Sequence, residues 1–179
     1  MNLSFMREMA LTTIILFFWG MMATPVSAQP KEVELEKLKA VFIYKFTNYI
    51  EWPKTGGDFN VGVVDSPKTY EAMKEVFEGK SIAGRKVTLS SLKKPNKNVP
   101  YDILYIQHID TEVQSELGQL KSSGLLIITQ SEKGRHEKAA INFYLDADDK
   151  LSFEIDNERA IQHDIKINSR LLNLSRNRK

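Results

Sequence analysis

The densest apolar and aromatic stretch after the N-terminal leader is LKAVFIYKFTNYIEWP, residues 38–53. A helix turns by about 100° per residue, which gathers several of the large side chains here into one stripe: Leu35, Leu38, Phe42, Phe46 and Tyr49. The pattern predicts a helix that docks on the core through this stripe and ends at Pro53. Further apolar residues widen the surface beyond the stripe, so the helix either lies deep or offers a second face to a partner.

The segment before this stretch is rich in charge. Between residues 31 and 39, Glu32 and Glu36 are spaced so that they oppose Lys37 and Lys39 on a helix surface. This spacing predicts the first turns of the same helix, with the charged residues on a solvated face.

The N-terminus has the parts of a secretory signal peptide. A short basic region is followed by an apolar run over residues 9–20 and by small residues that end in Val-Ser-Ala at Ala28. We expect a signal peptide at residues 1–28, cleavage before Gln29, and an exported domain at residues 29–179. The alternative is that the run over residues 9–26 is kept as a membrane anchor, which its threonines and Pro25 disfavour.

Composition excludes several classes of function. The chain has no cysteine, so disulfides, thiolate nucleophiles and thiolate metal sites are excluded. Its formal net charge of +2 is too small to indicate nucleic-acid binding. A length of 179 residues, less a leader, suits one domain with a single ordinary core.

The remaining chain alternates predicted strands with predicted helices. The expected strands are residues 59–65, 85–89, 101–106 and 125–129, and the expected helices are residues 67–78 and 111–121. Two later strands, 140–145 and 151–155, are joined by a polar turn, and helices are expected from Asn157 to Ile161 and over residues 165–174. The pattern predicts an α/β fold of three layers, with a mainly parallel sheet flanked by helices and a C-terminal antiparallel hairpin.

Motifs for catalysis and for metal binding are missing from the sequence. It contains no nucleophile elbow and no phosphate-binding glycine loop, and His108, His136 and His163 stand far apart. The acidic turn at residues 146–149 lacks the glycine and the closing glutamate of a calcium loop. We therefore predict no catalytic residue, no metal and no cofactor, and a hydrolytic enzyme is the least favoured class.

Ligands of open parallel sheets bind outside the carboxyl ends of the strands. The polar residues at those positions are Asp65, Ser66, His108 and Ser131. They are the candidate ligand-binding residues, although ordinary helix capping and turn formation also explain such side chains.

A partner-binding surface is predicted from two other groups of residues. Aromatic side chains are denser around residues 42–52 than one docking stripe requires, and the C-terminus is basic. The candidate contacts are Phe42, Tyr44, Tyr49, Trp52, Arg170 and Arg176. Burial in the core is the competing interpretation for the aromatic residues.

The order of these segments resembles the YfiR-like family of periplasmic regulatory proteins, over essentially all of the chain after the leader. Two pieces are fairly specific together: the aromatic helix that runs into Glu51-Trp52-Pro53, and the closing Ile167-Asn168-Ser169-Arg170-Leu171-Leu172. Looser matches lie between them, at residues 59–64, 84–87, 101–106, 125–129, 141–143 and 151–156.

The resemblance implies a non-enzymatic periplasmic regulator, often a homodimer, that binds the periplasmic part of an inner-membrane signalling protein. In the namesake that partner is a diguanylate cyclase. This chain lacks the cysteines through which some members respond to redox state, and it has Ala139-Ala140 where a glycine pair often stands. A sensor kinase is therefore an equally suitable partner. The alternative function is a periplasmic small-molecule sensor with its pocket at the strand carboxyl ends.

Overall fold

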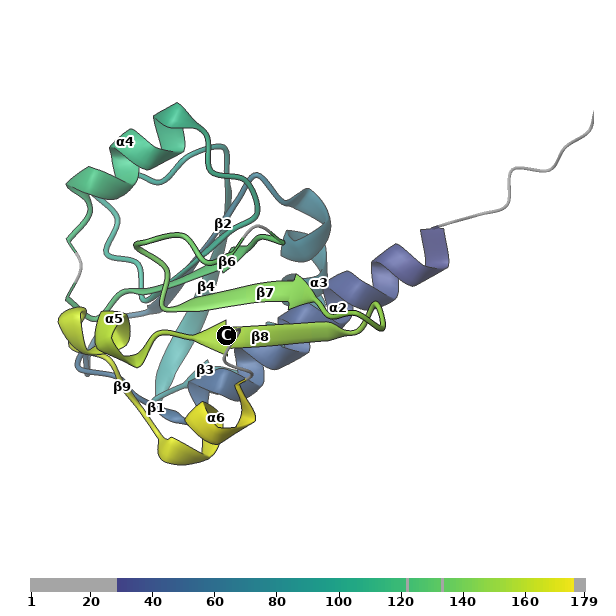
Figure 1. Ribbon diagram of the computed structural model, residues 1–179. Coiled ribbons are helices and arrows are strands. Elements are labelled where there is room, and N and C mark those ends of the chain that lie inside the picture. Colours follow the sequence, from purple (N-terminus) through teal and green to yellow (C-terminus); the bar gives the residue numbers. More distant parts are fainter. Residues whose placement is uncertain (1–28, 122, 133, 176–179) are drawn as a thin grey trace, which may run out of the picture. The chain divides into compact units, whose positions relative to one another are not determined.

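The computed structural model describes residues 29–121, 123–132 and 134–175 (Figure 1). The sheet and both hydrophobic cores belong to one compact unit, Lys31–Lys179. The predicted signal peptide, residues 1–28, and Arg176 lie outside the described residues. None of the helices in the described ranges combines the length and the hydropathy needed to cross a membrane.

A seven-stranded sheet organises the domain, in the order β3-β4-β2-β5-β6-β7-β8. The five strands from β4 to β7 run parallel, whereas β3 and β8 pair antiparallel at the two edges. The pairing of β7 with β8 is the predicted hairpin. The strands are β2 Phe59–Val64, β3 Ser81–Ile82, β4 Arg85–Leu92, β5 Ile103–Ile106, β6 Leu126–Gln130, β7 Ile141–Leu145 and β8 Leu151–Ile155.

Helices cover both faces of the sheet, so the predicted three-layer architecture is confirmed (Figure 1). Helices α2 (Gln29–Thr47) and α3 (Pro67–Phe77) contribute to one core, and α4 (Thr111–Gln119) contributes to the other. The side chains of β5 and β6 alternate between the two cores, as the pleat requires. Two short C-terminal helices, α5 (Asn157–Gln162) and α6 (Ser169–Leu174), add Ala160 and Leu171 to the first core.

Gly62 lets the second core close over β2. A Cβ atom at this position would lie 2.8 Å from Leu104 Cδ1 and 2.9 Å from Tyr101 Cε1. These side chains of the neighbouring β5 segment therefore pack directly on the Gly62 backbone.

The predicted ends of the first and last helices were wrong, for one shared reason. Helix α2 ends at Thr47 rather than Pro53, and the last helix begins at Ser169 rather than at residue 165. The residues lost from these helices form a small antiparallel sheet in which β1 (Ile50–Glu51) pairs with β9 (Lys166–Ile167). Pairing between two distant segments prevailed over the local preference for helix.

The predicted apolar stripe of α2 was also displaced. Leu38 and Tyr49 of that stripe are exposed, at 40% and 37%. The buried face instead carries Glu36 and Lys39, which had been assigned to a solvated surface, together with Ala40, Ile43 and Phe46.

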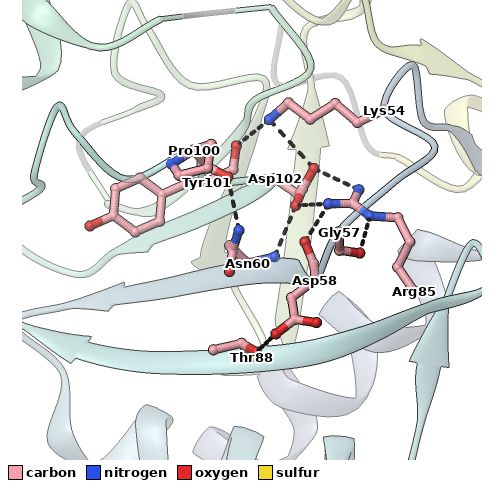
Figure 2. Close-up of polar contacts among 9 residues, drawn as sticks. All are labelled: Lys54, Gly57, Asp58, Asn60, Arg85, Thr88, Pro100, Tyr101 and Asp102. Carbon is pink, nitrogen blue, oxygen red and sulfur yellow. Dashed lines mark hydrogen bonds and ion pairs between the residues drawn. The ribbon is translucent and has the colours of Figure 1, made fainter.

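Asp102 joins three strands at the amino-terminal edge of the sheet (Figure 2). Its carboxylate is 1% exposed and accepts hydrogen bonds from both terminal nitrogens of Arg85, at 2.9 and 2.8 Å, and from the Asn60 backbone N–H, at 2.9 Å. Lys54 Nζ lies 3.5 Å from the same carboxylate and donates to the Tyr101 carbonyl oxygen at 2.8 Å. One buried anion thus links the starts of β2, β4 and β5 to the segment that leads into β2.

The Arg85 guanidinium extends these contacts. It donates to the carbonyl oxygens of Gly57 and Asp58, at 3.2 and 2.5 Å, and lies 5.1 Å from the centre of the Phe59 ring. The two parallel hydrogen bonds from the Arg85 guanidinium to the Asp102 carboxylate provide each charged group with partners inside the protein. Buried charges are tolerated only when they have such partners.

We predict that Asp102→Ala lowers the free energy of unfolding by about 3–5 kcal/mol, because the Arg85 guanidinium stays buried without its carboxylate. Urea denaturation would measure the loss. The matched control is Thr88→Ala, which removes only an exposed hydrogen bond to Asp58 and should cost no more than about 0.5 kcal/mol. A loss below about 1 kcal/mol for Asp102→Ala would contradict the role given to this ion pair.

Candidate functional site

The topology places the most favourable ligand site between β2 and β5. After β2 the chain passes through α3 to β4, which pairs with β2 in the direction of the β3 edge. After β5 it passes through α4 to β6, which pairs with β5 in the direction of the β8 edge. The connections therefore diverge at the carboxyl ends of these two neighbouring strands, where open α/β sheets bind their ligands. Asp65 and Ser66 follow β2 directly, and His108 follows β5 after Gln107.

This switch point is filled by the protein's own side chains. Glu36 and Lys39 reach it from α2 and meet Ser66 and Thr69 at the start of α3 and Gln107 at the end of β5; we call these five residues the switch-point cluster. Lys39 and Thr69 are 0% exposed, Ser66 is 4% exposed and Glu36 is 5% exposed.

A continuous chain of polar contacts runs through the cluster. Lys39 Nζ lies 2.5 Å from Glu36 Oε1, and the Thr69 hydroxyl donates to the other carboxylate oxygen of Glu36. Ser66 Oγ lies 2.5 Å from Thr69 Oγ1 and donates to Gln107 Oε1. Each of these buried groups has a partner, so the cluster ties α2 to α3 and to the end of β5.

The carboxylate of Glu36 lies where an anionic ligand would be expected. The N-terminus of a helix favours negative charge, and Glu36 contacts Thr69 in the first turn of α3. The neighbouring Tyr105 is affected by the same negative charge. Burial raises the pKa of its phenol, and the Glu36 charge raises it further. The switch point thus contains a fixed internal anion.

Two of the four predicted ligand residues line one cavity beside the cluster. His108 and Ser131 are among the residues around a cavity of about 460 Å³, together with Gln130 and His136. Asp65 and Ser66 are not part of its lining; Asp65 is exposed in a left-handed conformation with φ 52°, and Ser66 belongs to the switch-point cluster. The structure therefore divides the predicted set between two adjacent places.

The cavity is lined in large part by polar side chains, including those of two histidines. His136 Nε2 lies 2.6 Å from Gln114 Oε1, and burial lowers the pKa of the His136 imidazole. Of the three histidines, His108 and His136 share this cavity, whereas His163 is buried elsewhere with its Nδ1 2.9 Å from the Leu125 carbonyl oxygen. Within the described ranges, no three His, Asp or Glu side chains are grouped so that they could hold a metal ion.

Most of the predicted partner-binding aromatics lie partly inside the domain. Phe42 packs among Phe46, Phe143 and Phe153, with ring centres 6.0 to 6.4 Å apart. Tyr44 lies edge-on to Phe77 at 5.4 Å, and Trp52 lies edge-on to Phe59 at 4.8 Å. All three are half-buried.

Tyr49 and Arg170 are the exposed members of the predicted contact set, and the fold brings their segments together. The Asn168 N–H donates to the Tyr49 carbonyl oxygen at 2.8 Å, next to the pairing of Ile50 with Ile167. Arg170 lies in the first turn of α6, whose cap is Asn168. The aromatic segment and the basic segment therefore meet at one surface, although Arg176 lies outside the described residues.

The switch-point cluster was not recognised from the sequence. Glu36 and Lys39 have the three-residue spacing of a helical ion pair, and that spacing was visible. Their burial was not, because exposed pairs with the same spacing are far commoner.

We predict that Glu36→Ala costs about 3–5 kcal/mol of unfolding free energy, because the Lys39 ammonium stays buried without its partner. The double variant Glu36→Leu/Lys39→Met should lose much less, since it removes both charges together. Glu32→Ala is the control on the same helix, because its ion pair with Lys68 is exposed. Equal losses for Glu36→Ala and Glu32→Ala in chemical denaturation would show that the buried pair has no special role.

Comparison with known proteins agrees with the resemblance seen in the sequence. A search of curated proteins found no match to this chain. The model of one protein family, described as YfiR/HmsC-like, matches residues 36–176. The match begins at Glu36 in α2 and includes all seven strands of the main sheet, both strands of the small sheet and α6. The chain therefore belongs to the YfiR/HmsC-like family.

Proposed function

We propose that this protein is a non-enzymatic periplasmic regulator. It binds the periplasmic part of an inner-membrane signalling protein, either a diguanylate cyclase or a sensor kinase, and modulates the output of that receptor. The observation that carries this proposal is the family match over residues 36–176. The signal-peptide pattern of residues 1–28 supports the location, since export places the domain on the same side of the membrane as a receptor's periplasmic part.

The regulator acts by shifting the balance between signalling states of its receptor. A binding protein changes that balance only if its affinity for one state exceeds its affinity for the other. A coupling free energy of about 1–3 kcal/mol is sufficient for useful control.

The surface that joins Tyr49 to α6 is the best candidate for receptor contact. Tyr49 is 37% exposed and Leu174 is 67% exposed, so this surface offers apolar area, and Arg170 adds an exposed cation. Aromatic and arginine side chains contribute much of the energy at protein interfaces. Phe42, Tyr44 and Trp52 are half-buried and each packs on a core ring, so they offer a partner less side-chain area than Tyr49 does.

We predict that Tyr49→Ala and Arg170→Ala each weaken receptor binding by about tenfold or more, while circular dichroism and the melting temperature stay close to those of the parent. Binding would be measured by calorimetry, with a receptor periplasmic domain first captured from solubilised inner membranes and identified by mass spectrometry. Lys121→Ala is the matched control. Lys121 is an exposed basic residue that follows α4, and it belongs neither to the segment around Tyr49 nor to α6.

Loss of binding in the Lys121 control as well would show a general effect of charge or handling. Unchanged binding in both test variants would place the contact elsewhere on the domain. Failure to capture any membrane protein with folded, correctly exported material would count against the regulator function itself.

The cavity beside the switch point favours a second candidate function, a periplasmic small-molecule sensor. Its volume of about 460 Å³ is of the size that holds small ligands, and His108 and Ser131 contribute polar groups to the lining. Such a ligand would lie next to Gln107, which contacts Ser66 in the switch-point cluster.

We predict for this second function that a small polar metabolite present at about 100 times its dissociation constant stabilises the fold by about 2.7 kcal/mol. A thermal-shift screen would detect such a ligand. His108→Ala should abolish the shift, whereas His163→Ala, at a histidine outside the cavity, should lower the baseline stability and keep the shift. A screen without any shift would leave the receptor-binding function as the sole candidate.

A further inference from the structure

Another cavity lies at the amino-terminal end of β6, between the end of α4 and α5. It has a volume of about 450 Å³, and its lining comes from α4, the start of β6, the turn before β7, and α5. It shares no lining residue with the cavity around His108, which lies at the carboxyl end of the same strand. The two cavities are therefore separate places on the domain.

The lining of this cavity combines apolar side chains with positive charge. The apolar side chains of Leu117, Leu125 and Ile127 are buried. The basic side chains of Lys138 and Arg159 are half-buried. A small solute in the cavity would thus contact both apolar surface and two cations.

Arg159 has hydrogen-bond donors that the protein leaves unused. Its Nε atom is buried and has no hydrogen-bond partner among the described residues. Nη1 donates to Gln162 Oε1 at 2.7 Å, and no hydrogen bond joins Nη2 to another described residue. Nε and Nη2 lie on the same edge of the guanidinium plane, which is an edge that binds a carboxylate or a phosphate through two parallel hydrogen bonds.

A buried donor without a partner costs free energy, which a ligand at this edge would recover. The Arg159 side chain as a whole is half-buried, so rotation about its side-chain bonds can bring the edge to a ligand in the cavity.

The acidic residues around α5 do not neutralise this edge. Asp156, the N-cap of α5, accepts from the Arg159 backbone N–H at 2.9 Å, and its other carboxylate oxygen lies 2.7 Å from Arg135 Nη2. Glu137 lines the cavity but is exposed, and neither Glu137 nor Lys138 forms an ion pair with another described residue. Two basic side chains thus face one exposed carboxylate, which leaves the lining with a net positive charge.

The walls of the cavity are held in place by hydrogen bonds. His163 is 7% exposed, and its Nδ1 lies 2.9 Å from the Leu125 carbonyl oxygen. The Gly124 N–H donates to the His163 carbonyl oxygen at 2.6 Å. These bonds fix the end of α5 against the start of β6, so a ligand finds a cavity that is already formed and spends little binding energy on ordering it.

We propose that this cavity binds a small anion through a carboxylate or phosphate group. The group accepts two hydrogen bonds from the Nε and Nη2 edge of Arg159 and lies near the Lys138 ammonium. The rest of the ligand lies on Leu117 and Leu125. A volume of about 450 Å³ suits a small molecule of this kind. The proposal does not depend on the regulatory function proposed above.

The test is a calorimetric titration of the protein, purified from the periplasm, with inorganic phosphate and with succinate. Arg159→Lys keeps the positive charge but loses the two parallel donors, so we expect it to raise the dissociation constant by about tenfold or more. Glu137→Gln removes the one carboxylate that repels the ligand and should lower the dissociation constant by about two- to fivefold.

Gly118 offers a second test that leaves Arg159 intact. It lies in the cavity lining on α4, and a Cβ atom there would lie in open space. Gly118→Glu and Gly118→Gln place side chains of nearly the same shape at this position, and only the first adds a negative charge. We expect Gly118→Glu to bind the anion about two- to fivefold more weakly than Gly118→Gln does.

Three results would overturn the proposal. The first is the absence of binding of both anions to the folded parent protein. The second is an affinity that is the same in Arg159→Lys and the parent, together with equal affinities of the two Gly118 variants. The third is binding that His108→Ala abolishes and Arg159→Lys retains, since the anion would then occupy the other cavity.

Discussion

The buried carboxylate of Asp102 is the constraint on which the arrangement of the sheet depends. It receives hydrogen bonds from Arg85 of β4 and from the Asn60 N–H of β2, and it belongs to the residue that precedes β5. A charge that is 1% exposed is tolerated only when such partners surround it. The starts of three parallel strands and the segment that enters β2 are therefore held in one register at the amino-terminal edge (Figure 2).

The opposite edge is held by a second buried ion pair with a different consequence. Glu36 and Lys39 bring α2 over the carboxyl ends of β2 and β5, and Thr69 fixes Glu36 against the start of α3. The place where open α/β sheets bind their ligands is thereby occupied by an internal carboxylate. The sheet thus has the topology of ligand-binding α/β proteins, but its switch point is filled and contributes to stability, whereas the adjacent cavity of about 460 Å³ is open to small molecules.

The surfaces that remain for other molecules lie in different parts of the domain. The small β1–β9 sheet presents Tyr49 beside the segment of Arg170, and the outer edge of β4 presents unpaired main-chain groups. The first of these surfaces is suited to a receptor by its exposed aromatic and basic side chains.

The sequence by itself determined the alternation of strands and helices, the terminal hairpin and the family, because these depend on local periodicity and on turn residues. Helix α3, for example, runs over Pro67–Phe77, where the sequence predicted a helix over residues 67–78. Only the tertiary structure decided that Ile50 pairs with Ile167, which ended α2 early, and that Lys39 is buried. The physical reason is that both features depend on partners distant in sequence. Ile50 pairs with a strand more than a hundred residues away. Lys39 is buried because Thr69 and the sheet enclose its ion pair with Glu36, whereas pairs of this spacing usually lie on surfaces.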